Sequence, residues 1–306
     1  SIHPRVCRET DRQTDMSPSV LRCGLCGTVL LCVLTAMTAQ AYLPVLVMHG
    51  IFSSPAGMQP IKDFIDQAHP GTQVILIDMN NDLDSFAPLW QQVQSLQGLI
   101  ESFNLTTDYH FVTHSQGGVL VRALAQSWDQ HRIRTWVSLS GPLMGQYGDT
   151  EFLRFLFPTV APAELFEILY TPVMQKSLSV ANYWKDPRQR DSYLSGNIFL
   201  PLLNNEVETN RSAAYRRNFE RIQQLVMLGG PDDGIIMPYV SALWGFYDDN
   251  LHYEPMEQTA LFQSNSFGLR TLQEQGKLVT FNISGIFHTY WESSPTAFRA
   301  YEPFLT

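Results

Sequence analysis

Short apolar runs alternate along this chain with segments whose apolar residues recur at helical spacing. The runs predict strands at residues 44–48, 74–77, 109–112, 135–139, 224–228 and 278–281. The helical spacing predicts helices over residues 61–68, 88–103 and 117–131. Strands that alternate with helices in this way predict an α/β fold, in which helices cover a parallel sheet.

The alternation stops between residues 142 and 205, which are rich in Phe, Leu, Tyr and Pro. This composition predicts a series of short helices inserted between two strands. We therefore expect one domain over residues 42–306, with a lid-like insertion at about 142–205.

The N-terminal part of the chain has a different pattern. After Met16 come Arg22, a short apolar run at residues 29–34, and small residues that end in Ala39-Gln40-Ala41. This order predicts a secretory signal peptide over residues 16–41. A transmembrane anchor is the alternative, but the run is short for a bilayer. Residues 1–15 are polar and patternless, and we expect them to be an upstream extension with no part in the fold.

All four cysteines precede residue 42: Cys7, Cys23, Cys26 and Cys32. The predicted mature chain therefore has no disulfide, no thiolate metal site and no cysteine nucleophile, and the spacing Cys23-x-x-Cys26 is read as incidental. Three N-x-S/T sequons predict a glycoprotein. They begin at Asn104, Asn210 and Asn282. Asn282 is the weakest of them because it adjoins a predicted strand.

Composition narrows the class of partner. The chain is 44% hydrophobic and 12% aromatic, as is typical of a globular protein. Its formal net charge of −9 argues against a nucleic-acid partner, since phosphate binding needs a basic surface.

The strongest chemical signal is Thr113-His114-Ser115-Gln116-Gly117, which joins a predicted strand to a predicted helix. A serine on such a turn projects its hydroxyl clear of the backbone, as in the G-x-S-x-G motif of α/β-hydrolases. Thr113 stands where that motif has its first glycine. The alternative is that Ser115 only caps the helix.

A nucleophilic serine needs an acid and a histidine, and in an α/β-hydrolase both follow it in the chain. Asp232 and Asp233 lie on a glycine-rich loop after the strand at 224–228, and His288 follows the last strand. Of the two acids, we favour Asp233 and keep Asp232 as the fallback. His252 lies in an acidic, irregular segment and is interpreted as a surface residue.

The same fold places two backbone amides around the oxyanion. Gln116, directly after the serine, supplies one amide, and Ile51 in the loop after the first strand supplies the other. His49 precedes the serine and belongs to that loop, so it is not the base. His114 is expected to pack against neighbouring loops. This machinery uses no cofactor and no metal.

Five stretches together resemble the lysosomal palmitoyl-protein thioesterase family. They are VMHG at 47–50, THSQGG at 113–118, SLSGPLMGQYGDT at 138–150, GGPDDG at 229–234 and GIFHTYW at 285–291. The resemblance covers essentially all of residues 42–306. It implies an α/β-hydrolase of the lysosome that cleaves long-chain fatty-acyl thioesters, such as acyl-CoA or S-acylated protein, through an acyl-serine intermediate. It assigns Ser115, Asp233 and His288 as the triad.

The chain departs from that family in two ways. Family members commonly carry disulfides in this domain, whereas this chain can form none there, and Thr113 replaces a glycine. Neither departure removes a catalytic group.

We expect the insertion to supply the acyl-binding surface. The candidates are Phe152, Phe155, Leu156, Phe157, Leu165, Phe166, Ile168 and Leu169. Packing of these residues in the core of the insertion is an equally good interpretation. Two other functions stay open, an oxygen-ester lipase or esterase with the same triad and a non-catalytic lipid-binding protein with the same shell.

Overall fold

The computed structural model describes residues 42–306. The predicted signal peptide, the extension before it and all four cysteines lie outside the described residues.

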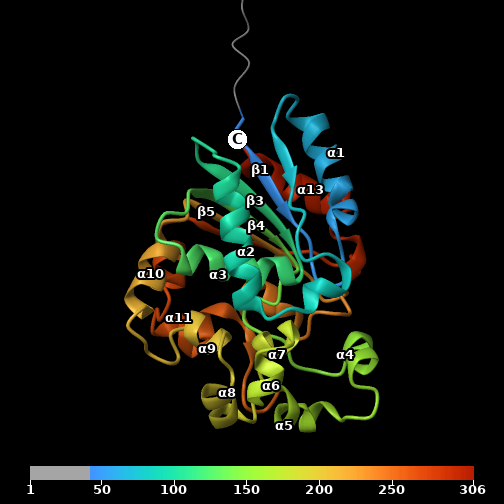
Figure 1. Cartoon of the computed structure of the whole chain (residues 1–306), viewed down its shortest axis with the longest axis vertical. Helices are drawn as coiled ribbons and strands as arrows, with labels where there is room; N and C mark the ends of the chain where they lie inside the picture. Colours follow the sequence, from blue (N-terminus) through green and yellow to red (C-terminus); the bar gives the residue numbers. More distant parts are fainter. Residues whose placement is uncertain (1–41) are drawn as a thin grey trace, which may run out of the picture. The chain divides into compact units, whose positions relative to one another are not determined.

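Six parallel strands form the central sheet, in the order β2-β1-β3-β4-β5-β8 (Figure 1). Their bounds are β1 (Val45–Met48), β2 (Val74–Leu76), β3 (Tyr109–His114), β4 (Ile133–Leu139), β5 (Gln224–Gly229) and β8 (Leu278–Asn282). Each lies within two residues of a strand predicted from the sequence. The predicted α/β-hydrolase fold is therefore confirmed.

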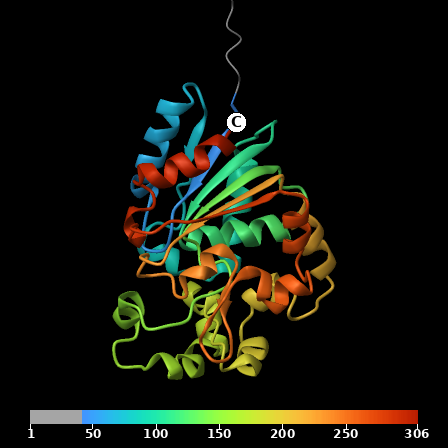
Figure 2. The same ribbon diagram turned by 180° about the vertical axis from the view of Figure 1, so that it is seen from behind.

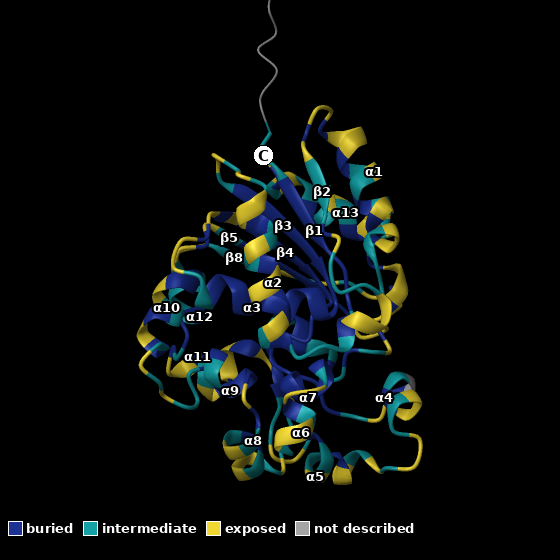
Figure 3. Ribbon diagram, viewed as in Figure 1, coloured by how far each residue is buried: buried dark blue, intermediate teal, exposed yellow. Residues whose placement is uncertain are grey.

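The two faces of the sheet belong to different cores. On one face, Val45 and Val47 of β1 pack with α1 (Gln59–Ala68) and α13 (Pro295–Tyr301), which lie side by side in Figure 2. On the other face, Leu46 and Met48 pack with α2 (Leu89–Ser102) and α3 (Gln116–Ser127). Because both faces are covered, the central strands are buried along their length (Figure 3). Each fully buried aliphatic side chain contributes about 1.5–3 kcal/mol.

The connection from β4 to β5 is a series of helices. They are α4 (Glu151–Leu156), α5 (Leu165–Leu169), α6 (Pro172–Gln175), α7 (Ser179–Tyr183), α8 (Arg190–Gly196), α9 (Leu200–Leu203) and α10 (Ser212–Glu220). In Figure 1, α4 to α8 lie below the sheet, beyond the carboxyl ends of its strands, whereas α10 packs on α3. The helical segment therefore stands over the edge of the sheet at which the loops with the candidate catalytic residues begin.

Several elements gave no clear signal in the sequence pattern. They are α10, the hairpin of β6 (Phe246–Tyr247) and β7 (Tyr253–Glu254), α11 (Ala260–Gln263), α12 (Leu269–Glu274) and α13. The helices among them have nine residues or fewer, at most about two and a half turns, and the two strands have two residues each, so no apolar pattern stands out. Within residues 42–306 no helix is long and apolar enough to cross a bilayer; α2 has 14 residues, against about 20 needed for a span.

Candidate active site

Three loops meet at the carboxyl edge of the sheet. They follow β3, β5 and β8 and carry Ser115, Asp233 and His288, respectively. Parallel strands bring the ends of all their loops to one edge, which is where ligands bind in open α/β sheets. The fold thus gathers side chains that lie up to 173 positions apart in the chain.

Ser115 lies on a strained turn between β3 and α3. Its φ of 54° and ψ of −128° are unusual for a residue with a side chain. The start of α3 approaches the end of β1 so closely that a Cβ on Gly117 would lie 2.5 Å from the carbonyl oxygen of His49, the residue after β1. Thr113 fits without a glycine because its hydroxyl donates to Val137 O and accepts from the indole of Trp136. The threonine that replaces the first glycine of the motif is therefore accommodated by hydrogen bonds to β4.

The side chains of Ser115, His288 and Asp233 form one hydrogen-bonded line. Ser115 Oγ lies 2.9 Å from His288 Nε2, and His288 Nδ1 lies 2.9 Å from Asp233 Oδ2. With Nδ1–H donating to the carboxylate, the lone pair on Nε2 faces the serine hydroxyl. All three residues are buried, Asp233 completely. The structure therefore brings the predicted triad together in a geometry suited to proton transfer.

Asp233 is held by more donors than the histidine alone. Ser140 Oγ donates to Oδ2 at 2.5 Å and Trp291 Nε1 at 2.8 Å, while the amides of Ile235 and Ile236 donate to Oδ1. Burial opposes ionisation of Asp233, but the hydrogen bonds from His288, Ser140 and Ile236 outweigh it and lower its pKa to about 2. The sequence reasoning missed Ser140 and Trp291, although both lie in stretches that carried the family resemblance.

A Ser140→Ala substitution tests this network. We expect Ser140→Ala to lose about 2 kcal/mol of unfolding free energy at pH 6, because a hydrogen bond to a carboxylate is lost. The lowered pKa of Asp233 stabilises the fold fully above about pH 4, and this contribution disappears as pH falls toward 2. The difference between the two proteins should therefore shrink over that interval. Denaturant titrations from pH 2 to 6 measure it.

Ser138→Ala is the matched control for that experiment. Ser138 lies near the end of β4, two residues before Ser140, and is also fully buried, but its hydroxyl has no hydrogen-bond partner among the described residues. Removing an unpaired hydroxyl should change stability by less than about 1 kcal/mol at every pH. Equal losses in the two variants would show that Ser140 acts only by filling space.

Two backbone amides beside Ser115 are free to bind an oxyanion. Within residues 42–306, the amides of Ile51 and Gln116 donate to no protein acceptor, whereas the amide of Phe52 already donates to Ser85 Oγ. A Cβ on Gly50 would lie 2.7 Å from the Cβ of Ser115, so the loop after β1 can approach the serine only because residue 50 is glycine. This arrangement suits the predicted pair of donors.

The other histidines considered in the sequence lie outside the triad's line of hydrogen bonds. His49 Nδ1 lies within hydrogen-bond distance of Gly50 O in the loop after β1, and its Nε2 within the same distance of Met79 O in the loop after β2. His114 donates through Nε2 to His288 O, and burial lowers its pKa to about 3, so its ring is neutral. His252 is an exposed partner of Asp248, as expected for a surface residue.

Asp232 makes a different contact from Asp233. Its Oδ2 accepts a hydrogen bond from the amide of Gly285 at 2.7 Å, and its side chain is exposed. The carboxylate thus ties the loop after β5 to the loop after β8, and it does not contact the ring of His288 in the way that Asp233 does.

A cavity of about 280 Å³ opens onto Ser115 and His288. Its wall comes from the loop after β1, the β4–β5 helical segment and the loops after β5 and β8. The lining residues are Ile51, Phe52, Ser53, His114, Ser115, Pro142, Gln146, Phe152, Leu153, Val180, Tyr183, Ile235, Ile236, His288, Thr289 and Glu292. Most of the wall away from the triad is apolar.

The structure places one of the eight acyl-binding candidates, Phe152, on this wall. Leu165 and Leu169 are buried in the core, and Phe155 is 74% exposed. The remaining four lie outside the cavity lining, and three of them pack against the core: Leu156, Phe157 and Phe166, with Ile168 half-buried beside them. The apolar wall is completed by residues that the sequence did not single out, Leu153, Val180, Ile235 and Ile236.

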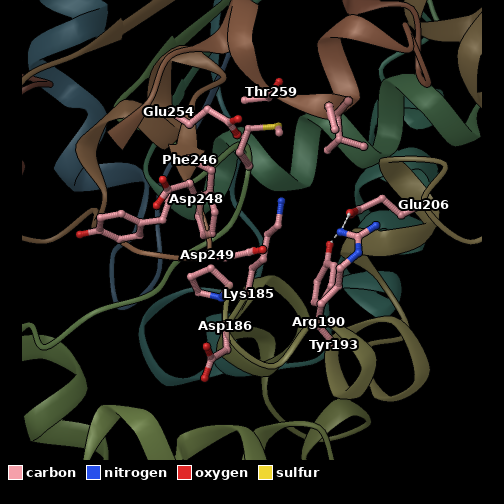
Figure 4. A pocket seen from close by; sticks show the side chains of 15 residues that line it. Lys185, Asp186, Arg190, Tyr193, Glu206, Phe246, Asp248, Asp249, Glu254 and Thr259 are labelled. Carbon is pink, nitrogen blue, oxygen red and sulfur yellow. Dashed lines mark hydrogen bonds and ion pairs between the residues drawn. The ribbon is translucent and has the colours of Figure 1, made fainter. Parts of the chain in front are cut away.

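A second cavity of similar size surrounds Lys185 (Figure 4). Charged and aromatic side chains line it. Glu206 accepts hydrogen bonds from Arg190 and Tyr193, and the Lys185 ammonium lies 4.6 Å from the ring centre of Phe246. No serine, cysteine or histidine lines this cavity, so it holds no Ser–His or Cys–His pair like that of Ser115 and His288.

The three sequon asparagines, Asn104, Asn210 and Asn282, are all exposed. Across the described part of the chain, no three His, Cys, Asp or Glu side chains are grouped as metal ligands.

Comparison with known proteins adds to this geometry. A family model described as "Palmitoyl protein thioesterase" matches residues 44–288. The chain is 40% identical to lysosomal thioesterase PPT2 of Rattus norvegicus over 269 residues, which cover 87% of this chain and 89% of that protein. It is 38% identical to the PPT2 homolog of Drosophila melanogaster, over 83% of this chain and 88% of that protein.

Proposed function

Because the chain belongs to the palmitoyl protein thioesterase family, we propose that it hydrolyses long-chain fatty-acyl thioesters, with Ser115 as nucleophile, His288 as general base and Asp233 as the acid that orients the imidazole. The observation that carries this proposal is the continuous hydrogen-bonded line of the three side chains, at the mouth of an apolar cavity.

In the first half of the reaction, His288 Nε2 takes the proton of the Ser115 hydroxyl as Oγ attacks the thioester carbonyl carbon. The amides of Ile51 and Gln116 hold the negative charge that forms on the carbonyl oxygen. The carbon–sulfur bond then breaks, and His288 returns its proton to the leaving sulfur. The products of this half are a thiol and an acyl-serine.

In the second half, water replaces the thiol. His288 takes a proton from that water as its oxygen attacks the acyl-serine carbonyl, and the same two amides hold the oxyanion. Collapse of the intermediate returns the proton to Ser115 Oγ and releases the fatty acid. Asp233 stays ionised throughout, consistent with its lowered pKa, and stabilises the imidazolium formed in each half.

The apolar part of the cavity wall is suited to the acyl chain. Phe152, Leu153 and Val180 come from the helical segment, and Ile235 and Ile236 from the loop after β5. Burying an alkyl chain against them is favourable by about 0.8 kcal/mol for each methylene. We therefore assign these five residues to the acyl half of the substrate.

A thioester has to be distinguished from an oxygen ester, since the same triad can cleave both. We expect kcat/KM to be at least roughly ten-fold higher for a long-chain thioester than for the oxygen ester of the same acyl and alkyl groups, because a thiolate leaves with less assistance than an alkoxide. Side-by-side assays of the purified protein measure the ratio. A clear preference for the oxygen ester would instead support a lipase or esterase.

We also propose that the protein works in the lysosome and reaches it through the secretory pathway. Relatives are named lysosomal thioesterases, and the three exposed sequon asparagines suit N-glycosylation in the secretory pathway. Expression in a secreting cell line should yield a glycoprotein whose mass falls on enzymatic removal of N-linked glycans.

A further inference from the structure

The cavity wall beside Ser115 is divided between apolar and polar residues. Besides the apolar residues, the lining includes His114, Thr289 and Glu292, and His114 Nε2 lies 3.7 Å from Glu292 Oε2, so these residues form a polar corner. A charged or polar corner is a poor environment for an alkyl chain, because the chain would strip water from groups that it cannot bond. The polar corner therefore suits the other half of the substrate.

Glu292 brings an unused acceptor into this corner. Its side chain is only 15% exposed, and its Oε2 has no hydrogen-bond partner among the described residues. The nearest donor, His114 Nε2, is 3.7 Å away and already donates to His288 O at 3.0 Å. A buried acceptor without a donor costs about 1–3 kcal/mol, a cost that a ligand N–H could remove.

The position of Glu292 relative to His288 indicates which half of the substrate it meets. It follows His288 by four residues, just after the short turn of helix His288–Tyr290, and its Oε2 lies 3.7 Å from Nε2 of His114, whose ring centre is 4.8 Å from that of His288. In the proposed mechanism His288 returns a proton to the leaving sulfur. The thiol half must therefore lie on the side of the cavity where Glu292 stands.

We propose that His114, Thr289 and Glu292 form a subsite for the thiol half of the substrate, in which Glu292 Oε2 accepts a hydrogen bond from an N–H two carbons away from the sulfur. This inference rests on the proposed thioesterase function. Both plausible thiols have such a group, since an amide nitrogen lies two carbons from sulfur in the pantetheine arm of coenzyme A and in a cysteine residue of a peptide.

The protonation of Glu292 does not remove its acceptor. Burial raises the pKa of this carboxyl, while a hydrogen bond from its own backbone amide and the nearby His288 act in the opposite direction. A protonated carboxyl keeps its carbonyl oxygen as an acceptor, as a glutamine would. Glu292 can thus accept a hydrogen bond from a donor on the substrate in either state.

Matched substrates test the subsite. One is a fatty-acyl thioester of N-acetylcysteamine, and the other has a methylene group in place of its N–H. We expect wild-type kcat/KM to be roughly ten-fold higher for the first, the effect of one hydrogen bond to a buried acceptor. In Glu292→Leu the ratio should fall to about one, and Glu292→Gln should keep most of it. Glu274→Leu, which removes an exposed carboxylate on α12, should leave the ratio unchanged.

The outcomes separate this inference from the function on which it rests. Equal cleavage of the two thioesters by the wild-type protein would overturn the subsite and leave the thioesterase function intact. Failure to cleave either would overturn the function itself. Because equal cleavage by the wild-type protein is by itself enough to overturn the subsite, the test stays decisive even if a variant fails to fold. Assays of Glu292→Leu with palmitoyl-CoA and with an S-palmitoylated cysteine peptide then show which thiol uses the contact, and no loss with either contradicts the proposal.

Discussion

Replacing Ser115 by alanine is expected to lower thioesterase turnover by on the order of a million-fold, the effect of removing a serine nucleophile together with the function of its base. Without Oγ no acyl-enzyme can form, and His288 has no hydroxyl to deprotonate. The remaining rate would come from substrate binding and from the Ile51 and Gln116 amides. Steady-state assays with a palmitoyl thioester measure the loss.

Labelling with a fluorophosphonate probe gives an independent measurement of the same residue. The wild-type protein should react covalently with the probe, and Ser115→Ala should not. Ser264→Ala, a substitution at an exposed serine of the C-terminal half, should label as the wild type does. A wild-type protein that resists the probe and has no turnover would favour the alternative of a non-catalytic lipid-binding protein.

Replacing Asp233 by asparagine is expected to cost about 10⁴-fold in kcat. Aspartate accepts a hydrogen bond from His288 Nδ1–H, whereas the NH₂ group of asparagine can donate one to Nδ1 instead. The imidazole can then adopt the tautomer that points Nε2–H at the serine. The amide would also present its NH₂ group to the donors Ser140 Oγ and Trp291 Nε1 or to the backbone amides on the other side. The loss should therefore appear in kcat, and also as a lower unfolding free energy.

Asp232→Asn is the matched control, one residue away on the same loop. Its exposed carboxylate accepts one bond from the amide of Gly285, and asparagine can accept the same bond through its own oxygen. We expect less than a ten-fold change in kcat. If Asp232→Asn were the inactive protein and Asp233→Asn the active one, the assignment of the acid would be reversed.

The apolar pattern predicted the six strands of the sheet and nearly their bounds along the chain. Runs such as residues 45–48 are buried on both faces, so every residue in them is apolar and the strand is evident without its neighbours. Helix α3 ended earlier than predicted, at Ser127, because Trp128 adopts extended backbone angles. Short elements such as α10 and α12 offered too few turns for a period to emerge.

The insertion shows where apolar patterning stops being informative. Eight apolar residues between 152 and 169 were equally good candidates for the cavity and for the core, because both environments select the same side chains. The fold places Phe152 at the cavity and buries Leu165 and Leu169 elsewhere. Only the direction of each short helix over the sheet decides whether its apolar side chains line the cavity or pack in the core.

The sequence by itself determined the α/β fold, the serine turn, and the chain order in which a serine, an acid and a histidine each follow a strand of the sheet. These features are local, since each depends on a few neighbouring residues and their period. The tertiary structure decided which acid faces His288, which groups support that acid, and that Glu292 lines the same cavity as Ser115 with an unused oxygen. Such contacts depend on how the loops of distant strands align at the edge of the sheet, and that alignment is set by the register of all six strands together.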